Sequence, residues 1–209
     1  MIVADLTRRM MPGMPVWPGD PPLNAVPAAD AGRDGCAVTR VTLGTHCGTH
    51  MDAPAHVLPG GRTLDRFPPE RFLGWAVTAR SRGPQITEAD LQPVLESAVR
   101  AGFLLVHTGW DVHWGDADCF TGYPPLTEGA AALLAGSGLR CLGLDTPGPD
   151  APGDASLPHH RALLGADILL VENLRGLDRL PDVPVRFQAL PLALAGADGA
   201  PVRAVAYWE

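Results

Sequence analysis

Residues 87–109, TEADLQPVLESAVRAGFLLVHTG, place a capped helix directly before a short apolar strand. Thr87 is a favourable N-cap residue, and acidic side chains follow it in the first turn of a helix predicted over 87–100. Pro93 lies inside this run, so we expect an irregular first turn. The apolar run 103–109 predicts a short buried strand. A helix followed by a buried strand is the repeating unit of an α/β domain.

The same alternation of short helices and apolar strands continues along the chain. Strands are predicted where β-branched or apolar runs lie between turn residues, and helices where a Ser or Thr cap precedes a short run. These rules predict strands over 38–43, 75–81, 141–148 and 167–174, helices over 127–135 and 156–164, a loop over 29–35, and two C-terminal strands joined by a turn at Asp198–Gly199. With no internal repeat or linker, the pattern predicts one α/β domain with a mixed sheet over residues 1–209.

All 16 basic residues are arginine, and the absence of lysine excludes Schiff-base, pyridoxal-phosphate and Walker-type phosphate chemistry. The net charge of −7 argues against a nucleic-acid partner. No apolar run approaches the roughly 20 residues that a membrane helix needs, and the first residues lack a signal-peptide pattern. We therefore expect a cytoplasmic protein with neither a nucleic-acid nor a membrane partner. The four cysteines are too scattered for a disulfide framework or a cysteine metal site.

Residues 46–56, HCGTHMDAPAH, gather three of the seven histidines around an aspartate. The residues of interest all occupy even positions and are His46, His50, Asp52 and His56. In an extended chain they would share one face, and residues two apart lie about 6.6 Å from each other. His50 and Asp52 can therefore converge by side-chain reach. The two outer histidines can join them only if the chain bends, and Gly48 and Pro54 are where it can do so.

Imidazole and carboxylate side chains together suit Zn²⁺, Mn²⁺ or Fe²⁺. A His-His-Asp set also leaves a coordination position open for water, as a hydrolytic metal requires. The alternative is a polar strand end whose histidines are satisfied by ordinary hydrogen bonds.

A second group lies downstream. His159 and His160 stand at the start of a predicted helix, and Glu172 follows an apolar strand-like run. A buried carboxylate needs a partner or a metal ion. Surface histidines and a carboxylate that caps a neighbouring loop are the alternatives.

The pattern H-x-G-T-H-x-D-x-P-x-H at 46–56 resembles the cyclase family of metal-dependent hydrolases, which includes bacterial kynurenine formamidases and isatin hydrolases. The resemblance covers nearly the whole chain. Blocks that look like those of the family are DLTRRMMPGMPVWPGDPP (5–22), GRTLDRFPPERFLGWAV (61–77), GLDTPG (143–148), HHRALLGADILLVENLRGL (159–177) and ALPLALAGADGAPVRAVAYWE (189–209). The resemblance implies a mixed, barrel-like sheet with short flanking helices, of the swivelling β/β/α type.

The resemblance also implies roles for individual residues. Asp52 would bridge two ions, His56 would be the general acid/base, and Trp17 would line the substrate pocket. His160 is preferred over His159 because it directly precedes an R-x-L-L sequence. The metal ligands implied are His46, His50, Asp52, His160 and Glu172, for one or two ions of Zn or Mn per subunit.

By resemblance, we expect hydrolysis of an amide C–N bond in a small aromatic substrate, arylformamidase-like and of the N-formylkynurenine type. Metal-activated water would attack, and His56 would move the proton. The alternatives are opening of a cyclic amide as in isatin hydrolase, a non-hydrolytic cyclase or dehydratase, and a binding protein without turnover. The family also implies a homo-oligomer, dimer or tetramer.

The segment HTGWDVHWG (107–115) resembles the broader family rather than its formamidase branch. Its aromatic residues and histidines either shape a different pocket or form an ordered surface loop. Asp145, at a predicted strand end, either supports the site or serves a turn.

Overall fold

The computed structural model describes all residues 1–209, and its frame is a mixed sheet of eight strands in the order β1-β10-β4-β8-β7-β6-β5-β9. Strand β10 also pairs with β9, which closes the strands from β10 round to β9 into a barrel and leaves β1 outside on β10. The strands are β1 (Ile2–Asp5), β4 (His50–Asp52), β5 (Leu73–Arg80), β6 (Gly102–His107), β7 (Cys141–Leu144), β8 (Leu169–Glu172), β9 (Val185–Pro191) and β10 (Gly199–Trp208). The expected mixed, barrel-like α/β architecture is confirmed.

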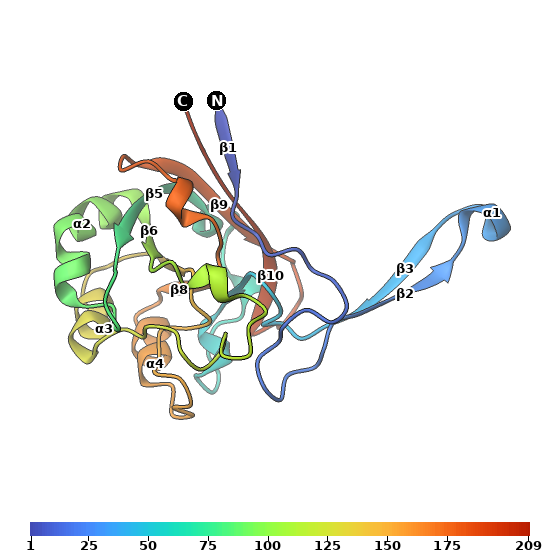
Figure 1. Ribbon diagram of the computed structural model, residues 1–209, viewed down its shortest axis with the longest axis horizontal. Coiled ribbons are helices and arrows are strands. Elements are labelled where there is room, and N and C mark those ends of the chain that lie inside the picture. Colours follow the sequence, from blue (N-terminus) through green and yellow to red (C-terminus); the bar gives the residue numbers. More distant parts are fainter.

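The helices lie in the connections between parallel strands. Strands β5, β6, β7 and β8 are parallel neighbours, whereas β4, β9 and β10 pair antiparallel. A parallel pair needs a long crossover, and here the crossovers carry α2 (Glu88–Ala101), α3 (Glu128–Ala135) and α4 (Pro158–Gly165). Figure 1 shows these helices together on one side of the barrel. The predicted alternation of helix and strand is therefore confirmed.

Strand β6 shows why the central strands are apolar throughout. Phe103 and Leu105 belong to one core with Phe187 of β9, whose ring centroid lies 5.2 Å from that of Phe103. Leu104 and Val106 belong to the other core, with residues of the helices. The sequence of a strand that is buried on both faces is apolar throughout, because the side chains on both faces are removed from water.

Helix α2 begins as predicted. The backbone N–H of Thr87 donates to the Asp90 carboxylate at 2.8 Å, and Gly102 ends the helix with a φ of 104°. The expectation of an irregular first turn was wrong, since the helix is continuous through Pro93. Pro93 lies on the exposed side, and the carbonyl that loses its partner belongs to exposed Ala89, where water can donate instead.

Two boundaries differ from the prediction. The segment 29–35 contains a one-turn helix, α1 (Ala31–Asp34), rather than a simple loop. The C-terminal strands do not turn at Asp198–Gly199, because Gly199 already pairs within β10. The connection is longer: the N–H of Ala53 donates to the Asp198 carbonyl at 2.9 Å, which holds this loop beside the histidine motif.

Strands β2 (Asn24–Ala29) and β3 (Val38–Thr42) form a separate antiparallel hairpin, with α1 at its tip. This hairpin, here called the arm, extends away from the barrel (Figure 1). The predicted strand at 38–43 is confirmed, yet every residue of β3 is exposed. No helix of the chain is long and apolar enough to cross a membrane.

The two bends that the histidine motif requires are present. Gly48 has a φ of +67° and turns the chain between His46 and β4. Pro54 starts a 3₁₀ turn, Pro54–His56, directly after β4. Because of these bends, the motif folds back on itself.

Substituting Gly48 tests the first bend. We expect Gly48→Ala to lower the free energy of unfolding by about 1–2 kcal/mol, since a Cβ is disfavoured at positive φ. The substitution should also weaken Zn²⁺ binding by displacing His46. Gly35→Ala is the matched control, because Gly35 has a φ of +80° at the tip of the arm. It should cost similar stability in urea titrations and leave Zn²⁺ affinity unchanged; equal loss of affinity in both variants would contradict the assignment.

Candidate active site

A cavity of about 400 Å³ is lined by the N-terminal segment, the histidine motif, the connection that follows β6 and the loop before α4. The sequence-predicted residues that line it are Trp17, His46, His50, His56, His160 and Glu172. Asp52 lies beneath them, with none of its surface exposed. The two histidine groups, more than a hundred residues apart in sequence, therefore converge on one place.

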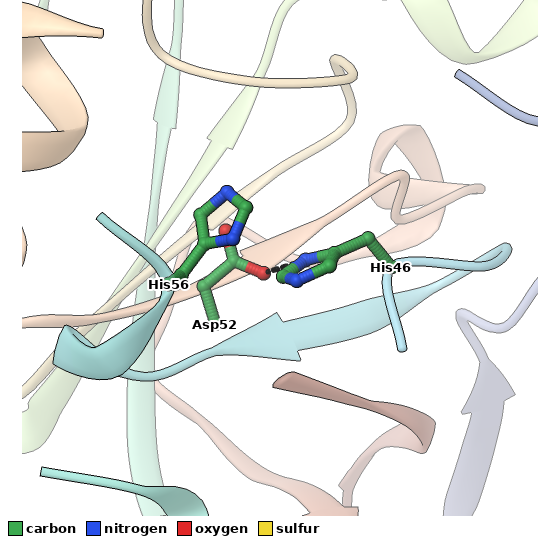
Figure 2. Close-up of side chains that lie close together, drawn as sticks. All are labelled: His46, Asp52 and His56. Atoms are coloured by element: carbon green, nitrogen blue, oxygen red, sulfur yellow. Dashed lines mark hydrogen bonds and ion pairs between the residues drawn. The ribbon is translucent and has the colours of Figure 1, made fainter. Parts of the chain in front are cut away.

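His46 folds back over β4 because of the Gly48 turn. Its Nδ1 lies 2.8 Å from Oδ1 of Asp52, as Figure 2 shows, and its ring centroid lies 4.0 Å from that of His56. Its Nε2 lies 3.1 Å from Oδ2 of Asp198. The imidazole is thus held between two carboxylates. Although burial opposes the charged form, the two carboxylates raise the pKa of His46 to about 10.

His50 and Glu172 are brought together by strand register, since they are paired positions of β4 and β8. Nδ1 of His50 donates to the Gly48 carbonyl at 2.8 Å. Its Nε2 lies 3.4 Å from a carboxylate oxygen of Asp52 and 3.4 Å from one of Glu172. In the neutral imidazole, Nε2 carries a lone pair, so acceptor atoms face one another there.

His160 approaches from α4. Asp150 accepts the backbone N–H groups of His159 and His160 at 2.6 and 3.1 Å, and its carboxylate also bonds Nδ1 of His160. Nε2 of His160 then lies 3.1 Å from Glu172 and 3.5 Å from Asp52. Burial opposes the charge of His160, but these carboxylates raise its pKa well above the usual value. The neighbouring His159 turns away, with Nδ1 3.1 Å from the Pro149 carbonyl.

The arrangement fits a divalent cation. Oδ2 of Asp52 is buried without a hydrogen-bond partner. Two sets of possible ligand atoms each lie within 4.8 Å of one another: His46, Asp52 and His56; and His50, Asp52 and Glu172. Nitrogen and carboxylate donors in this mixture suit Zn²⁺ or Mn²⁺. Acceptors that face acceptors are satisfied when a cation lies between them.

His56 stands at the rim of this cluster, on the 3₁₀ turn after β4 (Figure 2). Burial lowers its pKa below the usual value, and the charge of Asp52 offsets this only in part. Its Nδ1 lies 3.7 Å from Oδ2 of Asp198. A neutral imidazole beside a cavity can accept a proton.

Asp198 and Asp150 are the site residues that sequence reasoning missed. Each carboxylate bonds one of the histidines from the side away from Asp52. Asp198 was expected only in a turn, and Asp150 lies just beyond the strand predicted over 141–148. The spacing in sequence between each aspartate and the histidine that it contacts follows no pattern that would predict the contact.

Part of the cavity lining is aromatic. Trp17 packs edge-on against Phe120 with ring centroids 5.5 Å apart, and Trp114 lies 6.3 Å from Phe120. Trp114 therefore lines the cavity, as do Phe120 and Tyr123. Burial raises the pKa of Tyr123, with the charges of Glu172 and Asp150 adding to it, so its hydroxyl stays a donor. Flat, apolar walls of this kind suit an aromatic ligand.

Other residues of the segment 107–115 lie outside the cavity. His113 stacks on Trp110 with centroids 4.2 Å apart and pairs with Asp116 at the surface. Asp145 accepts hydrogen bonds from the N–H groups of Thr108 and Gly109, so it serves the loop after β6. The structure therefore favours the hypothesis that Asp145 stabilises a turn over the hypothesis that it supports the site.

Comparison with known proteins places the chain in a family. A model of the family described as putative cyclase matches residues 4–151. The kynurenine formamidase of Maricaulis maris (strain MCS10) is 34% identical over 206 residues, which cover 96% of this chain and 95% of that protein. The kynurenine formamidase of Salinibacter ruber (strain DSM 13855 / M31) is 32% identical over 213 residues, which cover 98% and 97%.

Solved structures agree with these matches. Isatin hydrolase A from Labrenzia aggregata, bound to benzyl benzoate, superposes with a TM-score of 0.85 at 25% sequence identity. The match covers 98% of this chain and 93% of the isatin hydrolase chain. A potential metal-dependent hydrolase with cyclase activity gives a TM-score of 0.81 at 27% identity, covering 98% and 96%. The chain belongs to the putative cyclase family and is an enzyme of the hydrolase type found there.

Removing the Asp198 carboxylate tests the electrostatics of His46. We expect Asp198→Asn to lower the pKa of His46 in metal-free protein, because one of its two carboxylate partners loses its charge. NMR titration of the imidazole signals measures this. Asp20→Asn is the matched control, since Asp20 lines the same cavity without contacting a histidine. An unchanged His46 pKa in Asp198→Asn would show that Asp52 alone sets it.

Proposed function

We propose that this enzyme is a metal-dependent amide hydrolase that cleaves the C–N bond of a small aromatic amide, in the manner of an arylformamidase. The observation that carries the proposal is the set of unsatisfied acceptors at the cavity floor. Oδ2 of Asp52 has no hydrogen-bond partner, with Nε2 of His160 3.5 Å away, and the Nε2 atom of His50 faces two carboxylates. The kynurenine formamidase relatives suggest N-formylkynurenine as the substrate type.

In this proposal, His46, His50 and Asp52 would hold one ion of Zn or Mn. A second ion, where present, would be held by Asp52, His160 and Glu172. Hydrogen bonds to Gly48 and Asp150 fix the ring orientations of His50 and His160. A divalent ion there lowers the pKa of water and polarises a carbonyl oxygen.

His56 is proposed as the general acid/base. Its lowered pKa leaves the imidazole neutral at neutral pH, so it can take a proton from water. It can then deliver that proton to the nitrogen of the leaving amine. Trp17 would hold the aromatic ring of the substrate against Phe120, away from the charged floor.

A second candidate function is hydrolytic opening of a cyclic amide. The observation that favours it is the superposition on isatin hydrolase A over 98% of this chain. The same floor and the same aromatic wall serve either substrate. The two candidates differ only in whether the leaving amine stays attached to the product.

A hydrolysis panel separates them. We expect N-formylkynurenine and simple formanilides to be cleaved with release of formate, and isatin to be cleaved more slowly. Liquid chromatography of the products and metal analysis of the same sample measure both properties. Isatin opened faster than every formanilide would support the second candidate instead.

Metal removal and a His56 variant test the mechanism. A chelator should abolish turnover, and Zn²⁺ or Mn²⁺ should restore it. His56→Ala should retain metal and lose about 10²- to 10⁴-fold in rate, as is typical for a lost general acid/base. His113→Ala is the control, because that histidine lies at the surface. Loss of metal from His56→Ala would show instead that His56 is a ligand, as its place within 4.8 Å of His46 and Asp52 allows.

We further propose that residues 1–209 act as one domain and assemble as a homo-oligomer, dimer or tetramer, through the arm. Val26, Val38 and Val41 are 42%, 49% and 53% exposed on it. An isolated two-stranded hairpin is marginally stable in water, and a second copy can cover this one in a closed symmetric pair.

Charge on the arm should break that assembly. We expect the double variant Val38→Asp/Val41→Asp to have a lower mass in light scattering than the unmodified protein, because burying two carboxylates at an interface is costly. Val183→Asp is the control, since Val183 is exposed but lies outside the arm. A monomeric unmodified protein, or a double variant of unchanged mass, would contradict the role of the arm.

A further inference from the structure

A second cavity, of about 270 Å³, has a lining without any hydrophobic residue. It is formed by Arg8, Asp111, Arg175, Gly176 and Arg179. The geometry points to a binding site for a small multivalent oxyanion of the phosphate or sulfate class. Such a site is separate from the histidine cluster and from the proposed hydrolysis.

The three arginines have no carboxylate within ion-pair distance. None of them forms an ion pair, although arginines elsewhere do so with Asp5, Asp34, Asp167 and Asp182. Arg8 is only 9% exposed, and its Nε is buried without a hydrogen-bond partner. A buried donor with no acceptor is costly, and no carboxylate of the chain offsets this cost at Arg8.

The charges around the cavity do not cancel. Asp111 is the one carboxylate in the lining, and its Oδ2 accepts the Gly176 N–H at 2.8 Å. The lining therefore carries an excess of positive charge in a chain whose net charge is −7. Burial lowers the pKa of Arg8 to about 10; the charge of Asp111 opposes this shift, and the charge of Arg175 adds to it. Arg8 remains charged at neutral pH.

Two of the three arginines, Arg8 and Arg179, are oriented by backbone carbonyls. One terminal nitrogen of Arg8 donates to the Asp111 carbonyl at 2.7 Å, and one of Arg179 donates to the Asp5 carbonyl at 2.9 Å. Nε of Arg179 also donates to the Gly176 carbonyl at 3.3 Å, so these bonds occupy part of each planar guanidinium. The remaining N–H groups present the forked geometry that matches phosphate or sulfate oxygens.

This cavity adjoins the aromatic wall of the main one. The Arg8 guanidinium lies over the Trp114 ring, 4.8 Å from its centroid, and Trp114 lines the main cavity. The backbone N–H of Arg8 donates to Thr49, the residue before β4, at 2.8 Å. An anion that fixes Arg8 would therefore also fix one wall of the substrate pocket.

Calorimetric titration of the metal-loaded enzyme with inorganic phosphate at constant ionic strength tests the site. We expect saturable binding to the unmodified protein, similar binding of sulfate, and weaker binding of acetate. In Arg175→Gln/Arg179→Gln, phosphate affinity should fall by at least about tenfold, because charge-assisted hydrogen bonds are lost. Arg100→Gln is the matched control, since Arg100 pairs with Glu96 on the exposed face of α2, and this variant should bind phosphate normally.

Several outcomes would overturn the site. Phosphate binding of equal strength in the double variant would place the anion elsewhere, including at the metal ions. Equal heats of titration with phosphate and with chloride at the same ionic strength would show that no specific binding occurs. Should the double variant fail to fold by circular dichroism, Arg175→Gln alone applies the same test, because Arg175 is exposed and its side chain bonds no other residue. Unchanged affinity there would likewise refute the site.

Discussion

The structure depends on one constraint, the complete burial of the Asp52 carboxylate. None of its surface is exposed, and one of its oxygens has no hydrogen-bond partner. An unpaired carboxylate away from water costs several kcal/mol. His46, His50 and His160 surround it, two from the motif 46–56 and one from α4. Their combined effect exceeds the cost of burial, so the pKa of Asp52 lies well below its usual value.

The fold supplies each of these histidines by a different device. Strand register places His50 opposite Glu172, a left-handed turn at Gly48 returns His46, and the start of α4 delivers His160. Acceptors on the far side of each ring, from Asp198, Gly48 and Asp150, then hold the orientations. Outer partners of this kind set which ring nitrogen is free to bind a cation. The inner and outer contacts are therefore parts of one electrostatic arrangement.

Local pattern was enough to predict much of this. The spacing within 46–56 indicated that the chain must bend at Gly48 and Pro54, and both bends are present. The helix 87–100 and the strand 103–109 followed from capping and apolar runs, because those signals lie within a few residues. The apolar run ahead of Glu172 correctly marked a buried carboxylate.

Contacts between residues far apart in the sequence could not be predicted from local sequence patterns. Asp198 meets His46 only because β10 pairs with β4, and the turn expected at Asp198–Gly199 hid that contact. The exposure of the arm was missed because alternation along β3 indicates a strand without showing whether a sheet covers it. Phe120 and Tyr123 line the cavity from an irregular connection, whose sequence has no helical or strand periodicity that could have predicted their positions.

The residues around the cavity lie on two kinds of backbone, paired strands and the connections between strands. His50, Asp52 and Glu172 lie on paired strands, whereas Trp114, Phe120 and Gly148 lie on connections between them. Strand positions are fixed by their hydrogen-bonded neighbours, while connections tolerate insertion and replacement. Ligand selectivity can therefore diverge through loop changes while the charged floor is kept, and a library confined to these connections is the natural route to new specificities on this barrel.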